Sequence, residues 1–191
     1  MAYADQRAAD GLDRWRTRKI DARLATIEDD IDSGTIGGGG DGWTYVFLAS
    51  DFTNSTTTPT NVTGLAFTPA ADTRYEIEGR FFVRSAATTT GAQIGVAWPT
   101  GIVAPSAAHL GSPSSATALT LRNVARGQTT QAAATGVPST TLEALGLLTA
   151  ILTTGGSPSG TFRVTLDSEV AASEARMVAG SFIRYREIPT S

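Results

Sequence analysis

The sequence predicts a mainly β protein: a β-sandwich or jelly-roll-like domain, preceded by an N-terminal helix and a glycine-rich linker. Charge is concentrated at the front, where residues 1–32 hold 6 basic and 8 acidic side chains of the 15 and 18 in the chain. Four consecutive glycines follow, and apolar and polar residues then alternate with a period of two, as in half-buried strands. We therefore expect a helical anchor or coiled-coil stalk (1–33), a linker (34–42) and a β-sandwich domain (43–191).

Composition excludes several classes of protein. The chain has 191 residues, enough for one domain with a sizeable core and an extension. Its 41% hydrophobic and 17% charged residues are typical of a globular protein, and its net charge of −3 predicts neither a nucleic-acid partner nor an acidic membrane surface. It has no cysteine for a disulfide or thiolate metal site. Neither a secretory signal nor a membrane span is expected, since the longest apolar run, near 142–152, is too short to cross a bilayer.

An apolar repeat in the charged segment predicts a short coiled coil. Ile20, Leu24, Ile27 and Ile31 are spaced by 4, 3 and 4 residues, which places Ile20 and Ile27 at d positions and the other two at a positions. Isoleucine at d with leucine or isoleucine at a favours three or four strands over two. We therefore expect a stalk that joins several copies of the chain. The alternative is an amphipathic helix packed on its own domain.

A separate amphipathic helix is expected over residues 2–16. Ala4, Ala8, Leu12 and Trp15 step by 4, 4 and 3 residues and so share one helical face. Such a short helix needs a partner surface to be stable. We interpret it as a peptide that docks on a larger assembly through Leu12 and Trp15. The alternative is a frayed N-terminus.

Strand patterns follow the linker in order. Trp43, Tyr45 and Phe47 alternate, a shorter strand covers 62–67, and 93–98 forms another. The strongest pattern is that of Arg74–Ser85. It places Tyr75, Ile77, Phe81 and Val83 on one face, and mainly charged side chains on the other.

The second half is less regular. Residues 99–115 contain three prolines with several Gly, Ser and Ala, which predicts a long surface excursion. A strand begins at Leu119 and Leu121. The run 142–152 fits either a helix, because a capping box precedes it, or a buried strand. We favour the strand, because residues 153–160 have the composition of a hairpin loop.

The end of the chain returns to clear alternation. Phe162, Val164 and Leu166 alternate with polar residues. A long last strand is expected to point Met177, Ala179, Ile183 and Tyr185 inward. About eight short strands with turn signals between them are typical of a sandwich or jelly roll.

No residue pattern indicates an enzyme. His109 is the single histidine and has no acidic neighbour, whereas a catalytic dyad or zinc site needs further groups. Glu76 and Glu78 share a strand face, but they alternate with apolar residues as a solvated face does. The glycine run 37–40 lacks the Lys-Ser/Thr ending of a phosphate-binding loop. We therefore predict no catalytic, cofactor-binding or metal-binding residue.

Several phrases in the β domain resemble those of tailed-bacteriophage structural proteins. They are TGLAFTP (63–69), TRYEIE (73–78), TTG (89–91) and the closing AGSFIRYREI (179–188). The last resembles the final strand of fibre, spike or decoration domains, and the resemblance covers about 43–188. It implies a trimeric or otherwise oligomeric β domain at the virion surface, attached through its N-terminal segment to a capsid or tail protein. It carries over no catalytic residue and leaves head or tail location open.

Two functions follow as expectations. The first is a non-enzymatic virion structural protein whose partners are further copies of itself, as a homotrimer, and other virion proteins. The alternative is a carbohydrate-binding or host-receptor-binding module that contacts a host-surface glycan. For that alternative Trp98, beside Pro99 and the long excursion, is the candidate platform for a sugar ring. The competing interpretation of Trp98 is a core residue.

Overall fold

The structure is a computed structural model that describes residues 35–37, 42–115, 118–129 and 131–189. The chain divides into two compact units, 1–37 and 38–191. In the first unit the described residues form one short strand, β1 (Thr35–Gly37). The predicted helical anchor, coiled coil and most of the linker lie outside the described residues.

The second unit is mainly β, as predicted, and its larger sheet is antiparallel. Its strand order is β2-β12-β5-β9-β7-β8, while β11 pairs with both β5 and β3. These strands are β2 (Thr44–Phe47), β3 (Phe52–Asn54), β5 (Arg74–Ser85), β7 (Thr100–Pro113), β8 (Leu119–Ala125), β9 (Ala144–Ser159), β11 (Ala175–Met177) and β12 (Phe182–Ile188).

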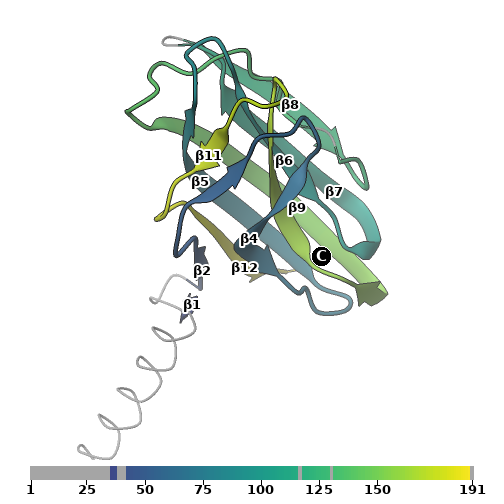
Figure 1. The fold of residues 1–191 in the computed structure, drawn as a ribbon. Helices are drawn as coiled ribbons and strands as arrows, with labels where there is room; N and C mark the ends of the chain where they lie inside the picture. The colour runs from purple at the N-terminus through teal and green to yellow at the C-terminus, as the bar shows by residue number, and fades with distance from the viewer. Residues whose placement is uncertain (1–34, 38–41, 116–117, 130, 190–191) are drawn as a thin grey trace, which may run out of the picture. The chain divides into compact units, whose positions relative to one another are not determined.

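A smaller antiparallel sheet lies against one face of the larger one. It has the order β4-β10-β6, formed by β4 (Thr60–Phe67), β10 (Phe162–Ser168) and β6 (Ala92–Ala97). In Figure 1 the ribbons of β4 and β6 lie across those of β5, β9 and β7. Two antiparallel sheets with a shared core are consistent with a β-sandwich.

The pairing of β5 with β9 forms the centre of the larger sheet. Its register is continuous from Arg74 opposite Thr153 to Val83 opposite Ala144. The predicted strand Arg74–Ser85 therefore has its expected bounds, and the strand prediction for 142–152 is also confirmed. Burial alternates along β5, so every second side chain points to the smaller sheet.

The core fills the space between the two sheets. Its largest side chains with less than 2% exposure come from both sheets. They are Phe81, Phe162, Leu65, Ile77, Ile94, Leu110, Leu148, Leu152, Leu166, Met177, Ile183 and Val62. Burying each contributes roughly 1.5–3 kcal/mol, so this contact is the main source of the domain's stability.

Two predicted loops are strands. Residues 99–115 were expected to be a surface excursion, but most of them form β7, which pairs with β9 on one side and β8 on the other. Its prolines are compatible with this, because Pro105 lies in a register break and Pro113 is the last residue. Residues 153–160 were expected to be a hairpin loop, but β9 continues to Ser159, and Gly160, with a φ of +84°, begins the connection to β10 of the smaller sheet. Pairing with the long β7 outweighs the local preference of Gly and Ser for turns.

The expected long last strand is two strands. A turn over 178–181 separates β11 from β12, and Gly180 adopts a φ of +86° there. Met177 and Ile183 are buried as predicted, whereas Ala179 lies in the turn and is exposed.

A close backbone contact covers the outer edge of β6. Residues 131–137 run beside this edge, where the Ala132 amide donates to the Ile94 carbonyl and the Val137 amide donates to the Thr88 carbonyl. A Cβ placed on Gly91 would overlap the Ala134 carbonyl, so only glycine fits there. The segment thus removes an open sheet edge.

We expect Gly91→Ala to destabilise the domain by about 2 kcal/mol, because the atom that must move is backbone rather than a flexible side-chain end. Urea unfolding followed by tryptophan fluorescence measures the change. Thr89→Ala, at an exposed neighbouring position, is the control and should change stability by less than about 0.5 kcal/mol. Equal stability of the two variants would contradict the close contact.

Candidate functional site

The larger sheet presents its second face away from the smaller sheet, and this open face is the candidate functional surface. Its outward side chains on β5 are Arg74, Glu76, Glu78, Arg80, Phe82 and Arg84. The register carries the same face through β12, β9, β7 and β8. Side chains from strands distant in sequence therefore meet in rows across it.

Two rows are ion pairs between β5 and β12. Arg184 and Glu78 are direct cross-strand partners, with Nη2 2.7 Å from Oε2. Arg186 and Glu76 repeat this arrangement at 2.6 Å. The four side chains are 25–39% exposed, so each pair contributes at most about 1 kcal/mol. We call these two pairs the ion-pair ladder.

The arginines of the ladder also contact two aromatic side chains, Trp43 and Tyr45. The guanidinium carbons of Arg184 and Arg186 lie 4.4 and 4.6 Å from the ring centre of Trp43. Arg184 also donates to the Tyr45 hydroxyl at 3.0 Å, and this bond together with Glu78 raises the pKa of Arg184. Trp43 is only 6% exposed, so its ring anchors the arginines and offers little surface to a ligand.

Next to the ladder lies a group of exposed and half-buried apolar side chains that we call the apolar band. It consists of Phe47, Phe182, Phe82, Leu145, Leu147, Leu119 and Leu121. Four of these are large and well exposed: Leu121 (57%), Leu145 (47%), Leu119 (41%) and Phe82 (38%). A soluble monomer rarely keeps such side chains contiguous, and large exposed patches commonly mark interaction sites.

The register brings Phe82 and the leucines of the band together, while Arg80 lies in the same cross-strand row as Phe182 and Leu147, between the two. Phe82 lies opposite Leu145, and Leu147 lies opposite Gly111, which in turn lies opposite Leu121. Gly111 has no side chain, and its Cβ position is 3.1 Å from the nearest atom of Leu119 and 3.3 Å from that of Leu121. The two leucines therefore lie over the glycine and extend the band across β7.

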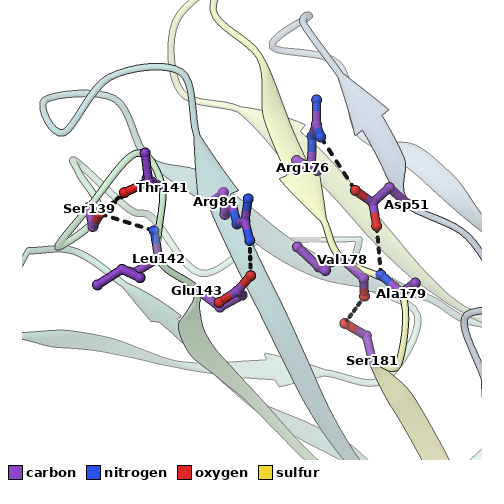
Figure 2. Close-up of polar contacts among 10 residues, drawn as sticks. All are labelled: Asp51, Arg84, Ser139, Thr141, Leu142, Glu143, Arg176, Val178, Ala179 and Ser181. Atoms are coloured by element: carbon purple, nitrogen blue, oxygen red, sulfur yellow. Dashed lines mark hydrogen bonds and ion pairs between the residues drawn. The ribbon is translucent and has the colours of Figure 1, made fainter.

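Beyond the band the face ends in a second charged group (Figure 2). Arg84 and Arg176 are direct cross-strand partners. Glu143 pairs with Arg84, while Arg176 binds Glu174 at 2.8 Å and Asp51 at 3.4 Å. The three carboxylates offset the repulsion between the adjacent arginines, and each arginine has its own carboxylate partner.

The sequence-predicted candidates are placed differently. His109 lies on β7 and contacts Asn123 at 2.7 Å, a cross-strand contact on the open face. Trp98 is half-buried, packs edge-on against Phe162 with ring centres 5.6 Å apart, and donates through Nε1 to the Gln128 carbonyl at 2.9 Å. This geometry favours a packing role for Trp98.

The remaining predicted site residues lie outside the described residues. They are Ile20, Leu24, Ile27, Ile31, Leu12 and Trp15. The sequence does not predict the apolar band, because it predicts a surface excursion at 99–115, where the structure has the strand β7 between β8 and β9. One signal was available: Leu145 and Leu147 alternate with Ala144 and Gly146, which places apolar residues on both faces of one strand.

The described residues contain no cluster of three or more His, Asp or Glu suited to a metal ion. Within the same residues no helix is long and apolar enough to cross a membrane. Neither observation adds a second candidate site.

One buried acid lies away from the open face. Asp167 on β10 is 3% exposed, and its Oδ1 has no hydrogen-bond partner among the described residues. Thr165, two residues earlier on the same side of the strand, is also buried with an unpartnered hydroxyl. Burial raises the pKa of Asp167 from 3.8 to about 7.

No protein-family model matches the chain, and a search of curated proteins finds no match. Its function therefore has to be inferred from its own residues.

We expect Asp167→Asn to stabilise the domain above pH 7. A carboxyl whose pKa is raised on folding binds its proton more tightly in the folded state, so its contribution to stability is complete below pH 4 and is lost as pH rises through 7. The loss is at most about 4 kcal/mol at 1.36 kcal/mol per pH unit, and we expect a gain of about 1–3 kcal/mol at pH 8 for the variant.

Urea unfolding at pH 5 and pH 8 measures this effect. The two proteins should differ mainly at pH 8, and Asp72→Asn, at an exposed position, should show no such pH-dependent difference. A wild-type protein as stable at pH 8 as Asp167→Asn would disprove the buried-acid assignment.

Proposed function

We propose that the chain is a non-enzymatic structural protein of a tailed-bacteriophage particle. It is a homotrimeric fibre, spike or decoration protein that displays a β-sandwich domain of jelly-roll-like type at the virion surface. Residues 2–16 attach it to a capsid or tail protein, and the coiled coil at 20–31 gathers the three chains. The resemblance in 43–188 supports the virion assignment.

The energetics of the stalk require a second contact between subunits. Two heptads bury Ile20, Leu24, Ile27 and Ile31 of each chain, at roughly 1.5–3 kcal/mol per side chain. Association also costs several kcal/mol of lost translational and rotational freedom. The stalk alone is therefore too weak to hold three chains at low concentration, so the β domains must contribute.

The apolar band is the observation that carries the proposal. It places leucine and phenylalanine side chains 38–57% exposed on a pre-formed sheet face. The charged groups on either side of it are already ion-paired. Arg80, which lies within the band between Phe182 and Leu147, forms no ion pair among the described residues, so the covering subunit has to meet its guanidinium with a carboxylate or leave it in water. A subunit of an assembly is expected to have such a surface.

The glycan-binding alternative depends on Trp98. Its indole packs against Phe162, and its N–H donates a hydrogen bond to the Gln128 carbonyl. A sugar platform needs an exposed ring face and free polar neighbours, so this geometry gives the alternative no support.

We expect the full chain to sediment as a trimer at micromolar concentration. The double variant Ile20→Asn/Ile27→Asn and the single variant Leu145→Glu should each weaken association by at least tenfold, because one removes the stalk seam and the other buries a charge in the band. Sedimentation equilibrium measures both, and circular dichroism should show an unchanged β spectrum.

Val170→Glu is the matched control for the band. Val170 is 48% exposed, like Leu145 at 47%, but it lies outside the band. It should leave the trimer intact. A monomeric wild type, or equal effects of the two glutamate substitutions, would refute the proposal.

The docking role of the N-terminus has its own test. Deleting residues 2–16 should give a folded trimer that is absent from purified particles, because a buried aromatic such as Trp15 commonly anchors an interface. Mass-spectrometric analysis of particles from a complementation strain measures incorporation. The control replaces Asp10 and Arg14 on the opposite helical face with alanine and should incorporate normally. Normal incorporation of the deletion would show that attachment lies elsewhere.

A further inference from the structure

A hollow of about 490 Å³ lies on the open face, on the far side of the ion-pair ladder from the apolar band. It is lined by Arg74, Ala104, Pro105, Ser106, Ala107, Ile151 and Ile188. It exists because β7 leaves its register with β9 between Val103, opposite Thr153, and Ala107, opposite Ile151. The three intervening residues stand opposite Leu152 alone and form a wall.

This wall is held by hydrogen bonds. The Thr153 amide donates to the Ser106 hydroxyl at 2.9 Å, and the Thr153 hydroxyl donates to the Pro105 carbonyl at 2.6 Å. Ser106 in turn donates to the Val103 carbonyl at 2.6 Å. The Ser106 hydroxyl and the Pro105 carbonyl therefore already have hydrogen-bond partners in β7 and β9. The hollow is pre-formed and presents mainly apolar surface.

Arg74 is the charged side chain of the lining. It lies opposite Ile188 on β12 and Thr153 on β9, neither of which can neutralise it. Among the described residues the half-buried Arg74 makes no ion pair within 4.0 Å, and its buried Nε has no hydrogen-bond partner. By contrast, Arg184 and Arg186 on the same face are both ion-paired, and Arg80, which forms no ion pair, donates to the Gly79 carbonyl. A guanidinium left in this state favours an anionic partner.

We propose that the hollow binds a small organic acid, an apolar body that ends in a carboxylate. The carboxylate binds the Arg74 guanidinium, and the body covers Ile151, Ile188 and Pro105. The volume is within the usual range for small-molecule sites, about 300–1,000 Å³. The lining contains no aromatic ring to stack on a sugar and no carboxylate to hold a cation. The site is independent of the virion proposal, because it requires neither the trimer nor the stalk.

The test is a titration of the full chain, labelled at isoleucine δ1 methyl groups, with octanoate by methyl NMR. The methyl groups of Ile151 and Ile188 should shift saturably, whereas those of the core residues Ile77, Ile94 and Ile183 should not. Octan-1-ol is the neutral probe of the same length. It should bind at least tenfold more weakly, because it cannot form the charged contact.

Three variants complete the design. Arg74→Gln should bind octanoate no better than octanol, while Arg122→Gln, at an exposed arginine on β8, should bind like the wild type. Ala107→Phe should fill the hollow and abolish binding of both probes. Unchanged core methyl shifts verify that each variant is folded.

The proposal is overturned by any of three results. The first is no saturable shift at Ile151 and Ile188 up to about 10 mM octanoate, because binding weaker than this would not indicate a specific site. The second is equal affinity for octanoate and octanol. The third is undiminished octanoate binding by Arg74→Gln or, should that variant not fold, by Ala107→Phe.

Discussion

The uninterrupted pairing of β5 with β9 is the constraint on which the rest of the domain depends. Because side chains alternate between faces, this one register decides which residues enter the core and which reach the open face. A slip by one residue would expose Ile77 and Phe81 and would bury Glu76 and Glu78. The cost of burying two carboxylates makes that alternative inaccessible. The same register places Phe82 opposite Leu145 and so creates the centre of the apolar band.

Local pattern was sufficient where a strand has one buried and one exposed face. The bounds of Arg74–Ser85 and the alternation of Phe162, Val164 and Leu166 could be read from the sequence, because burial on one side imposes a period of two. The failures occurred where composition and pairing disagree. β7 and the end of β9 are rich in Gly, Ser and Pro, yet each serves as the partner of the other. Pairing of residues about 50 positions apart is invisible to local pattern, and tertiary contacts outweigh weak propensities.

The candidate surface was predictable only in part, for the same reason. The alternating charges of β5 indicated a solvated face, and the structure pairs Glu76 and Glu78 with arginines of β12. The leucines of β8 and β9 were visible in the sequence, but their proximity depends on β7 lying between them with Gly111 at the crossing. The stalk and docking residues remain predictions of the sequence, since they lie outside the described residues.

The two ends of the open face differ in how many of their arginines are ion-paired, and we infer that they bind different partners. Beside the apolar band, Arg84, Arg176 and the two arginines of the ladder all have carboxylate partners. Arg80 lies within the band and donates to the Gly79 carbonyl, but it forms no ion pair among the described residues, so a surface that covers this end has to supply its partner or leave its guanidinium in water. At the hollow, Arg74 has no carboxylate opposite it, because its cross-strand neighbours are Ile188 on β12 and Thr153 on β9. The register break at Pro105 then raises a wall beside the unpaired cation. The proline-rich segment that misled the sequence-based assignment of β7 is therefore the segment that shapes the proposed site. A proline inside a paired strand is accommodated where the strand leaves its partner, and at Pro105 the resulting bulge forms the wall of the hollow.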